Sequence, residues 1–458
     1  MKGGIFLRKI PLNGAGSGVQ QFWNRCKRAA GLFRMTESGE RSQKPSLLTR
    51  RQFDWRGVRL AAATAGIGVL GLGGWLWSNR RRRYLNAART DVTSNNSLES
   101  HAAAKGLIYG AAVVPGWLDV EGIARGHTDD GYTQLVNSQT GMLVDEYTSY
   151  WKWLRPTPDR FNFKSIARLM RFAELTGKRV RGHVLVWHEA MPGWFQSVAN
   201  KQNARELLVN HIHTVAGRFK GRIETWDVVN EAIEPMDGRP DGLRKSPWLE
   251  LIGPEYIEMA FRAAAEADPQ AKLAYNDYGI ETNLSREVRK REMVLALLQR
   301  LKASGTPIHA VGVQSHLWPG LGGEAGLGLQ EFIREAAKMG LEVHISELDV
   351  SCMRVKGKPA ELDETVARIY GDYLNLVLAE PNVPLVITWG ITDAHTWLQS
   401  AWLLNAADKR RIWVKIAEGL RQRPLPFDND FNPKPAFWAL RAALDAAPQH
   451  STATTANG

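Results

Sequence analysis

The sequence predicts an α/β protein whose body is a (β/α)8 (TIM) barrel, preceded by a separate N-terminal segment. From Gly106 onward, short apolar runs rich in β-branched residues alternate with longer amphipathic stretches, which predicts parallel strands joined by helices. The eight runs between residues 106 and 446 match the eight strands of such a barrel. A doubly wound sheet is the alternative fold, but no glycine-rich phosphate loop follows a predicted strand.

Each predicted strand is a short apolar run, and each predicted helix carries apolar residues at i, i+3 and i+4 spacing. The strands are predicted at Leu107–Val113, Gly141–Val144, Arg179–Trp187, Glu224–Val229, Lys272–Asn276, Ala310–Gln314, Glu342–Ser346 and Leu385–Trp389. The helices are predicted at Phe163–Leu175, Ala204–Arg218, Glu255–Ala267, Arg286–Ala303, Leu329–Met339, Glu361–Leu378 and Pro435–Ala446.

Residues 1–90 are predicted to be an export-signal or anchor segment. The sequence Thr-Arg-Arg-Gln-Phe at 49–53 resembles a twin-arginine signal, and an uncharged apolar run follows at 60–77. We therefore expect export through the twin-arginine machinery to the periplasm or the cell exterior. The apolar run is also long enough to span a bilayer, so an uncleaved membrane tether through 60–77 is the alternative. A chance arginine pair before a membrane helix is a third interpretation.

Polar segments flank the predicted barrel domain, which covers 106–446. Residues 91–105 include Ser-Asn-Asn-Ser and are expected to form a linker. Residues 447–458 are small and polar, and they are expected to form a disordered tail.

The net charge of +12 suggests a nucleic-acid partner at first sight, but its distribution argues against one. Residues 1–90 carry 18 of the 59 basic residues and 3 of the 47 acidic residues. The remaining 41 basic and 44 acidic residues give the body a net charge of −3. The basic character belongs to the leader, so no nucleic acid is expected as a partner.

No metal or organic cofactor is expected. The body contains a single cysteine, Cys352, which excludes a disulfide within it, and no Cys/His cluster has the spacing of zinc ligands. The 17 tryptophans are unusually many, and flat aromatic rings suit the binding of pyranose sugars.

Seven of the eight predicted strands end in or beside polar side chains. In this barrel fold, active sites are built at the carboxyl ends of the strands, so we expect one converging polar pocket. The residues are Glu146, His183, His188, Asn230, Glu231, Asn276, Asp277, Gln314, His316, Glu347 and Trp389.

Two of these side chains, Glu231 and Glu347, follow the fourth and seventh predicted strands and should face each other across the barrel mouth. Cleavage of a glycosidic bond needs two facing carboxyl groups, one to protonate the leaving oxygen and one to attack or assist at the anomeric carbon. The alternative is that each glutamate is a structural ion-pair partner.

Several motifs resemble glycoside hydrolase family 10, the β-1,4-xylanase family. The resemblance runs in order from about residue 106 to 444. The motifs are Gly-His-Val-Leu-Val-Trp-His at 182–188, Trp-Asp-Val-Val-Asn-Glu at 226–231, Tyr-Asn-Asp-Tyr at 275–278, Gln-Ser-His at 314–316, His-Ile-Ser-Glu-Leu-Asp at 344–349, Thr-Trp-Gly-Ile-Thr-Asp at 388–393 and Phe-Asn-Pro-Lys-Pro at 431–435.

The resemblance implies a retaining, endo-acting hydrolase that cleaves xylan by double displacement. It implies that Glu231 is the acid/base and Glu347 the nucleophile, supported by Asn230, His316 and Asp349. It also implies a set of substrate-binding residues. They are Glu146, His183, Trp187, Gln314, Trp389 and Trp397.

Three departures from the family pattern fall in one region. Tyr147 replaces a sugar-binding Asn, Tyr150 replaces a Lys, and Ala190 replaces a Gln of the subsites on the non-reducing side. The glycone subsites therefore look divergent, and another β-linked polysaccharide, such as a substituted xylan or a bacterial exopolysaccharide, is an alternative substrate. A non-catalytic glycan-binding barrel and a membrane-tethered scaffold are further alternatives, but both glutamates are present.

Overall fold

The computed structural model describes residues 96–320, 325–399 and 422–450. By its internal contacts the chain divides into two units, Met1–Thr90 and Asp91–Gly458. The predicted leader, its twin-arginine motif and the apolar run at 60–77 lie outside the described residues. Among the helices that are described, none is both long and apolar enough to cross a membrane.

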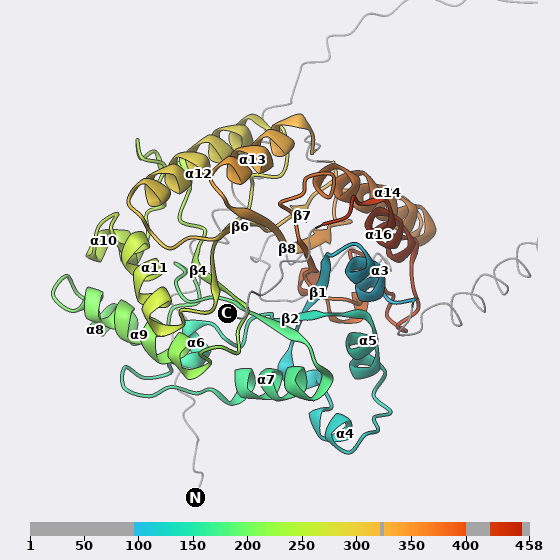
Figure 1. Cartoon of the computed structure of the whole chain (residues 1–458), viewed down its shortest axis with the longest axis horizontal. Coiled ribbons are helices and arrows are strands. Elements are labelled where there is room, and N and C mark those ends of the chain that lie inside the picture. Colours follow the sequence, from blue (N-terminus) through green and yellow to red (C-terminus); the bar gives the residue numbers. More distant parts are fainter. Residues whose placement is uncertain (1–95, 321–324, 400–421, 451–458) are drawn as a thin grey trace, which may run out of the picture. The chain divides into compact units, whose positions relative to one another are not determined.

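The described part of the second unit forms the predicted barrel, in which eight parallel strands close on themselves (Figure 1). Neighbouring strands pair in chain order, and the ring closes where β1 pairs with β9. The eight strands are β1 (Ile108–Val113), β2 (Met142–Asp145), β3 (Arg179–Gly182), β4 (Thr225–Asn230), β5 (Lys272–Asp277), β6 (Ala310–Val313), β8 (Glu342–Val350) and β9 (Leu385–Thr388). A two-residue strand, β7 (His316–Leu317), pairs with the carboxyl end of β8 and was not predicted.

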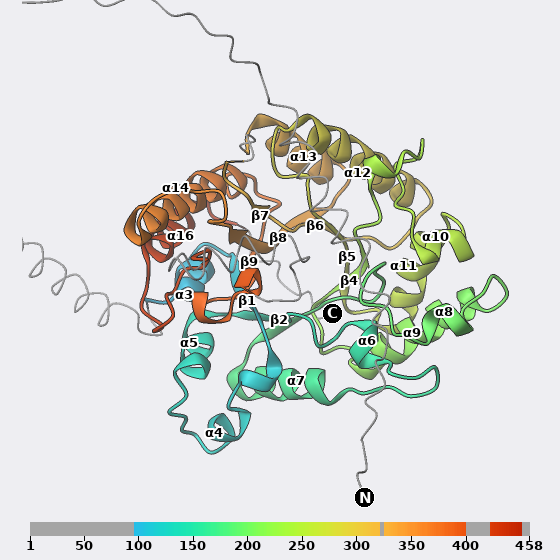
Figure 2. The same ribbon diagram turned by 180° about the vertical axis from the view of Figure 1, so that it is seen from behind.

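Helices surround the strands, and Figure 2 shows the same arrangement from behind. All seven predicted helices are present, with ends that shift by up to two residues. They are α7 (Lys164–Thr176), α9 (Ala204–Arg218), α11 (Tyr256–Ala267), α12 (Ser285–Ala303), α13 (Leu327–Lys338), α14 (Pro359–Val377) and α16 (Pro435–Ala446). Shorter helices lie in the connections. They are α4 (Val120–Ala124), α6 (Trp151–Leu154), α8 (Phe195–Val198) and α10 (Pro247–Leu251).

One crossover helix was not predicted. Helix α5 (Gly131–Gln139) lies between β1 and β2, and Asp130 caps it by accepting a hydrogen bond from Thr133 N. Its buried face includes Tyr132, Leu135 and Val136. The helix therefore buries an ordinary amphipathic face against the barrel.

The predicted linker at 91–105 is wrong for its second half, which contains helix α3 (Leu98–Ala104). The Ser97 hydroxyl accepts a hydrogen bond from Ser100 N and caps the helix, and Leu98 and Ala102 are fully buried. The Ser/Asn cluster marks the start of a helix, because short polar side chains satisfy the free N–H groups there.

The predicted disordered tail is also wrong for its first residues. Ala447 and His450 are buried, and His450 N donates a hydrogen bond to Lys105 O at 2.8 Å. This contact joins the carboxyl-terminal segment to the end of α3 and completes the domain beyond the predicted boundary at 446. Residues 451–458 lie outside the described residues.

The strands that carry the two glutamates are both irregular. The pairing of β4 with β5 shifts between Asp227 and Val229, and that of β8 with β9 shifts between Ile345 and Leu348. Such bulges re-aim the side chains that follow or lie within them. They place Glu231 and Glu347 at the mouth of the barrel, where the strand ends converge.

Strand β3 is shorter than predicted, because it ends at Gly182 rather than Trp187. A Cβ atom at Gly182 would lie 2.1 Å from the Trp226 ring, so only glycine allows β3 and β4 to approach this closely. Leu185 and Val186 still donate backbone hydrogen bonds to β4, to Asp227 O and Val228 O.

Candidate active site

Glu231 follows β4 in a backbone conformation that is rare for a non-glycine residue. Its φ is +58°, in the left-handed region, which costs free energy on the order of 1 kcal/mol. Glu231 N donates to Asn276 O at 2.8 Å, and Arg244 Nε donates to Glu231 O at 2.6 Å. These two bonds hold the strained residue, and such strain is concentrated at functional sites.

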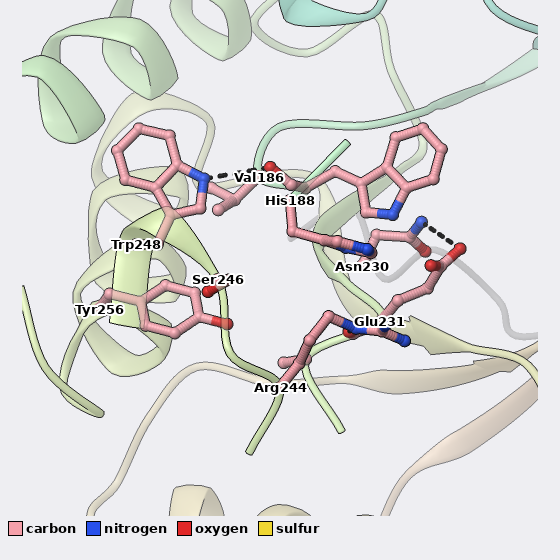
Figure 3. Close-up of a pocket in the computed structure, with 10 residues that line it drawn as sticks. Val186, His188, Asn230, Glu231, Arg244, Ser246, Trp248 and Tyr256 are labelled. Atoms are coloured by element: carbon pink, nitrogen blue, oxygen red, sulfur yellow. Dashed lines mark hydrogen bonds between the residues drawn. The ribbon is translucent and has the colours of Figure 1, made fainter. Parts of the chain in front are cut away.

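The Glu231 carboxyl group accepts hydrogen bonds from two neutral amides. Asn230 Nδ2 lies 3.2 Å from Oε1 (Figure 3), and Gln314 Nε2 lies 3.1 Å from the same oxygen. Both side-chain donors to this carboxyl group are therefore uncharged amides.

Glu347, in contrast, is buried against a cationic group. It is 5% exposed, its Oε1 accepts from Asn276 Nδ2 at 2.7 Å, and its Oε2 lies 3.2 Å from His316 Nε2. Burial alone would lower the pKa of His316, but Asp349 and Glu347 outweigh it and raise the pKa to about 10. The imidazolium form of His316 is thus present at neutral pH, and its positive charge lies beside the Glu347 side chain.

The His316 ring is held between two further groups. Asp349 Oδ1 lies 3.1 Å from His316 Nδ1, and Trp397 Nε1 donates to the other oxygen of Asp349. The Trp397 ring lies 4.9 Å from the His316 ring between centroids. This set fixes the orientation of the cation that contacts Glu347.

Asn276 connects the two glutamates. Its Nδ2 donates to Glu347 Oε1 and also to Asn230 Oδ1 at 2.9 Å, while its Oδ1 accepts from Ser346 Oγ at 2.7 Å. Asn276 was predicted at a strand end, without a role in catalysis or binding. Its place in the motif at 275–278 was the only pointer to this position.

A buried chain of charges beneath the site orients His183. Asp227 Oδ2 accepts from Arg181 Nε at 3.0 Å and lies 3.0 Å from His183 Nδ1. Burial opposes a charge on His183, but the Asp227 carboxylate outweighs it and raises the pKa of His183. Arg181 also contacts His344 through Nη1 at 2.7 Å, so the chain continues into the barrel interior.

The remaining predicted binding residues follow β2, β3 and β9. The His183 and Trp389 rings meet edge to face at 5.3 Å, and Trp187 Nε1 is buried without a hydrogen-bond partner among the described residues. Burial, with Asp145 and Asp349 nearby, raises the pKa of Glu146 to about 8. Glu146 is therefore largely protonated at neutral pH and can donate a hydrogen bond to a sugar oxygen.

Tyr150 occupies the same region. Its hydroxyl donates to Glu146 O at 2.8 Å, and its ring packs edge to face on His183 at 5.8 Å and Trp187 at 5.1 Å. Burial, followed by the negative charges of Glu347 and Glu146, raises its pKa well above the usual value. A neutral ring whose hydroxyl already donates a hydrogen bond to the backbone thus lies near Glu347 and Glu146.

A pocket lies next to Glu231 (Figure 3). Its lining includes His188, Arg244, Ser246 and Tyr256. Burial, aided by Arg244, lowers the pKa of His188 to about 3, so this imidazole is neutral. The pocket is also lined by Glu231.

The structure brings the predicted catalytic residues and the predicted binding residues into one connected mouth. The described residues hold no group of three or more His, Cys, Asp or Glu side chains arranged for a metal ion. A barrel with two glutamates linked through Asn230 and Asn276, one beside neutral amides and one against an imidazolium, has the site of the paired-carboxylate glycosidases.

The family model for glycosyl hydrolase family 10 matches residues 97–443, and the chain belongs to this family. It is 34% identical over 320 residues to a β-1,4-xylanase of Dictyoglomus thermophilum, which covers 68% of this chain and 83% of the relative. It is 34% identical over 342 residues to endo-1,4-β-xylanase A of Caldicellulosiruptor sp. strain Rt8B.4, but this covers only 44% of that protein and 69% of this chain.

The fold comparison agrees with the family. The crystal structure of native xylanase 10B from Thermotoga maritima superposes with a TM-score of 0.63 at 31% sequence identity. The match covers 76% of this chain and 98% of that structure. The predicted family and the predicted barrel are therefore confirmed.

Proposed function

We propose that the chain is an endo-1,4-β-xylanase that retains the anomeric configuration, with Glu231 as acid/base and Glu347 as nucleophile. The observation that carries the proposal is the hydrogen-bonded path from Glu347 through Asn276 and Asn230 to Glu231. It joins the two carboxyl groups at one site and gives them different surroundings. The xylanase names of the relatives, including the two enzymes above, support the choice of substrate.

In the first step, the Glu347 carboxylate attacks the anomeric carbon while Glu231 gives its proton to the leaving oxygen. The glycosidic C–O bond breaks, and an ester forms between the sugar and Glu347. The His316 cation and the Asn276 amide hold the attacking group in place. Asn230 is placed to hydrogen-bond the sugar 2-OH, a contact that strengthens in the transition state.

In the second step, Glu231 takes a proton from water, and the oxygen of that water attacks the same carbon. The ester bond breaks, Glu347 leaves as a carboxylate, and Glu231 is protonated again. Two inversions give net retention. The neutral amides of Asn230 and Gln314 suit a side chain that must alternate between acid and base.

A second candidate substrate is favoured by the geometry of Tyr150. A lysine at this position would offer three donors to a sugar, whereas the Tyr150 hydroxyl already donates to Glu146 O. With Tyr147 half-buried beside it and Ala190 lacking a polar group, recognition on the non-reducing side depends less on hydrogen bonds. A substituted xylan or a bacterial exopolysaccharide is therefore the alternative to plain xylan.

The test is reducing-end release by the purified chain on linear xylan, glucuronoxylan, arabinoxylan, cellulose and a bacterial exopolysaccharide. We expect release from at least one xylan, with oligosaccharides rather than single sugars as early products. Release from another polymer alone would identify that polymer as the substrate in place of xylan. No release from any polymer would overturn the proposed activity and favour a glycan-binding barrel.

We also propose that the enzyme is exported by the twin-arginine route, with the segment at 60–77 as signal or membrane tether. The support is sequence alone, namely Arg50 and Arg51 followed by an apolar run without charges. Replacing both arginines by lysine should retain the protein in the cytoplasm, as measured by cell fractionation. Unchanged export of that variant would exclude the twin-arginine route. Recovery of the wild type in the membrane fraction would indicate a tether, and recovery in the soluble exported fraction would indicate a cleaved signal.

A further inference from the structure

We infer that Trp117 is an additional sugar-binding position, on the non-reducing side of the cleaved bond and farther from it than Trp389 and Trp397. The inference rests on the proposed function, because it requires a β-linked polysaccharide in the barrel mouth. The ligand is a neutral pyranose unit of that same chain, bound by stacking on the indole ring.

Trp117 is an exposed aromatic ring with one covered face. It is 44% exposed, and the His395 ring lies against it at 4.5 Å between centroids with a 32° tilt. Tyr132 meets its edge at 6.3 Å and 75°. Since the side chain stays this exposed with one face stacked, the opposite face is open to solvent. A flat indole face of this kind can stack on the apolar face of a pyranose ring.

The loop that carries Trp117 is fixed by hydrogen bonds. Arg168 on α7 donates to Pro115 O at 3.1 Å through Nε and to Leu118 O at 2.7 Å through Nη2. The same guanidinium pairs with Glu121 at 2.7 Å, and Trp117 N donates to Val114 O at 3.0 Å. The indole is thus held in place before any ligand arrives, which reduces the entropy cost of binding.

The position of Trp117 relative to the catalytic groups follows from the barrel order. It ends the 3-10 turn η2 (Pro115–Trp117) that follows β1, and β1 lies between β9 and β2. Trp389 follows β9 and Glu146 follows β2, so Trp117 lies on the part of the rim between these two predicted substrate-binding residues. Glu231, which protonates the leaving group, follows β4 on another part of the ring.

The segment after β9 carries rings that contact both Trp117 and the surroundings of the nucleophile. His395, which stacks on Trp117, lies two residues before Trp397 in the segment after β9. Trp397 packs on His316, and His316 contacts Glu347. Trp117 is therefore positioned by the same segment that packs against His316, which places it at the mouth that holds the proposed nucleophile.

The chemistry of this surface favours an uncharged sugar. Burial lowers the pKa of His395 against the opposing effect of Asp130, so the imidazole behind Trp117 is neutral at neutral pH. The ring behind the indole therefore offers no cation to an acidic ligand. Stacking on the flat indole selects the apolar face of a pyranose.

The test compares wild type, Trp117→Ala and Trp117→Phe on β-1,4-xylo-oligosaccharides from xylobiose to xylo-octaose, or on the matching series of whichever polymer is cleaved. We expect Trp117→Ala to lower kcat/KM about tenfold on the longest substrates, equal to about 1.4 kcal/mol, and to leave the shortest unchanged. Trp117→Phe keeps a flat ring and should retain most of the wild-type kcat/KM on the longest substrates. Trp153→Ala is the matched control, since Trp153 is 50% exposed but has the Lys152 ammonium over its ring at 5.0 Å.

Equal kcat/KM for Trp117→Ala and wild type at every length, or an equal loss at every length, would overturn the inference. A second readout is binding of xylo-octaose to Glu347→Gln by calorimetry, where adding Trp117→Ala should weaken affinity about tenfold. The proposed activity fails separately, because the wild type would then cleave no oligosaccharide of any length.

Discussion

Replacing Glu347 by Gln should lower kcat by roughly 10⁴-fold or more on every substrate that the wild type cleaves, since the covalent step loses its nucleophile. The amide keeps the shape of the side chain and can still accept a hydrogen bond from Asn276 Nδ2. It has no charge to offer to the His316 cation and cannot form the ester. The fold should survive, because the barrel core does not depend on this side chain.

Kinetics with an aryl glycoside that carries a good leaving group give the sharpest measurement of this variant. Such a substrate needs little acid assistance, yet Glu347→Gln should remain inactive because bond formation to the enzyme is still blocked. The control is Glu380→Gln, the same chemical change at a buried glutamate that pairs with Arg334 outside the site. Activity of Glu347→Gln within tenfold of this control would remove Glu347 from the role of nucleophile.

Much of the fold could be predicted because a barrel strand is a short, continuous apolar run between polar residues. The runs at β5, β6 and β9 are of this kind, and the structure ends each of them within one residue of the prediction. The fifteen-residue helix α9 was predicted with both ends correct, since its apolar spacing extends over its whole length.

The errors arise where local composition and tertiary contacts favour different structures. The Ser/Asn cluster before α3 has the composition of a linker, but Ser97 caps a helix whose buried face packs on the barrel. In the segment after β3, apolar residues continue to Val186, yet the strand ends at Gly182. The periodicity of a single sequence does not show at which residue a strand stops pairing with its neighbour.

The candidate site could be predicted as a set of residues but not as a network. Strand ends in a parallel barrel meet at one edge, so Glu231, Glu347 and His316 were expected together. The bridging role of Asn276 depends on the direction in which its side-chain amide points. The hydrogen bond from the Tyr150 hydroxyl to Glu146 O depends on how the chain turns between these two residues. Both are features of side-chain geometry, which residue spacing does not contain.

Replacing Glu231 by Ala should give a different kinetic pattern, with a loss that depends on the leaving group. On xylan or an unactivated oligosaccharide, kcat/KM should fall by about 10³-fold, within the range attributed to general acid–base catalysis. With a good aryl leaving group, the first step no longer needs the proton, and it should proceed at close to the wild-type rate. The second step still lacks its base, so the glycosyl ester on Glu347 should accumulate.

The accumulated ester can be detected by intact-protein mass spectrometry as an adduct of one glycosyl unit after mixing with the activated substrate. Azide should restore turnover, because a small anion fits the space left by the carboxyl group between Asn230 and Gln314 and needs no base. Its product should be the β-glycosyl azide, since the azide attacks the ester from the side that water would use.

The stereochemistry of the rescued product separates the two glutamates. A Glu347→Ala variant with azide should give the α-azide in a single displacement, whereas Glu231→Ala gives the β-azide through the ester. The reverse pattern would exchange the two roles and show that the hydrogen-bond partners had been misinterpreted. Rescue of both variants to the same anomer would contradict double displacement, because then only one face of the sugar would be open to the anion. Two carboxyl groups that flank one glycosidic bond leave space on opposite faces of the sugar, so the two variants should give opposite anomers.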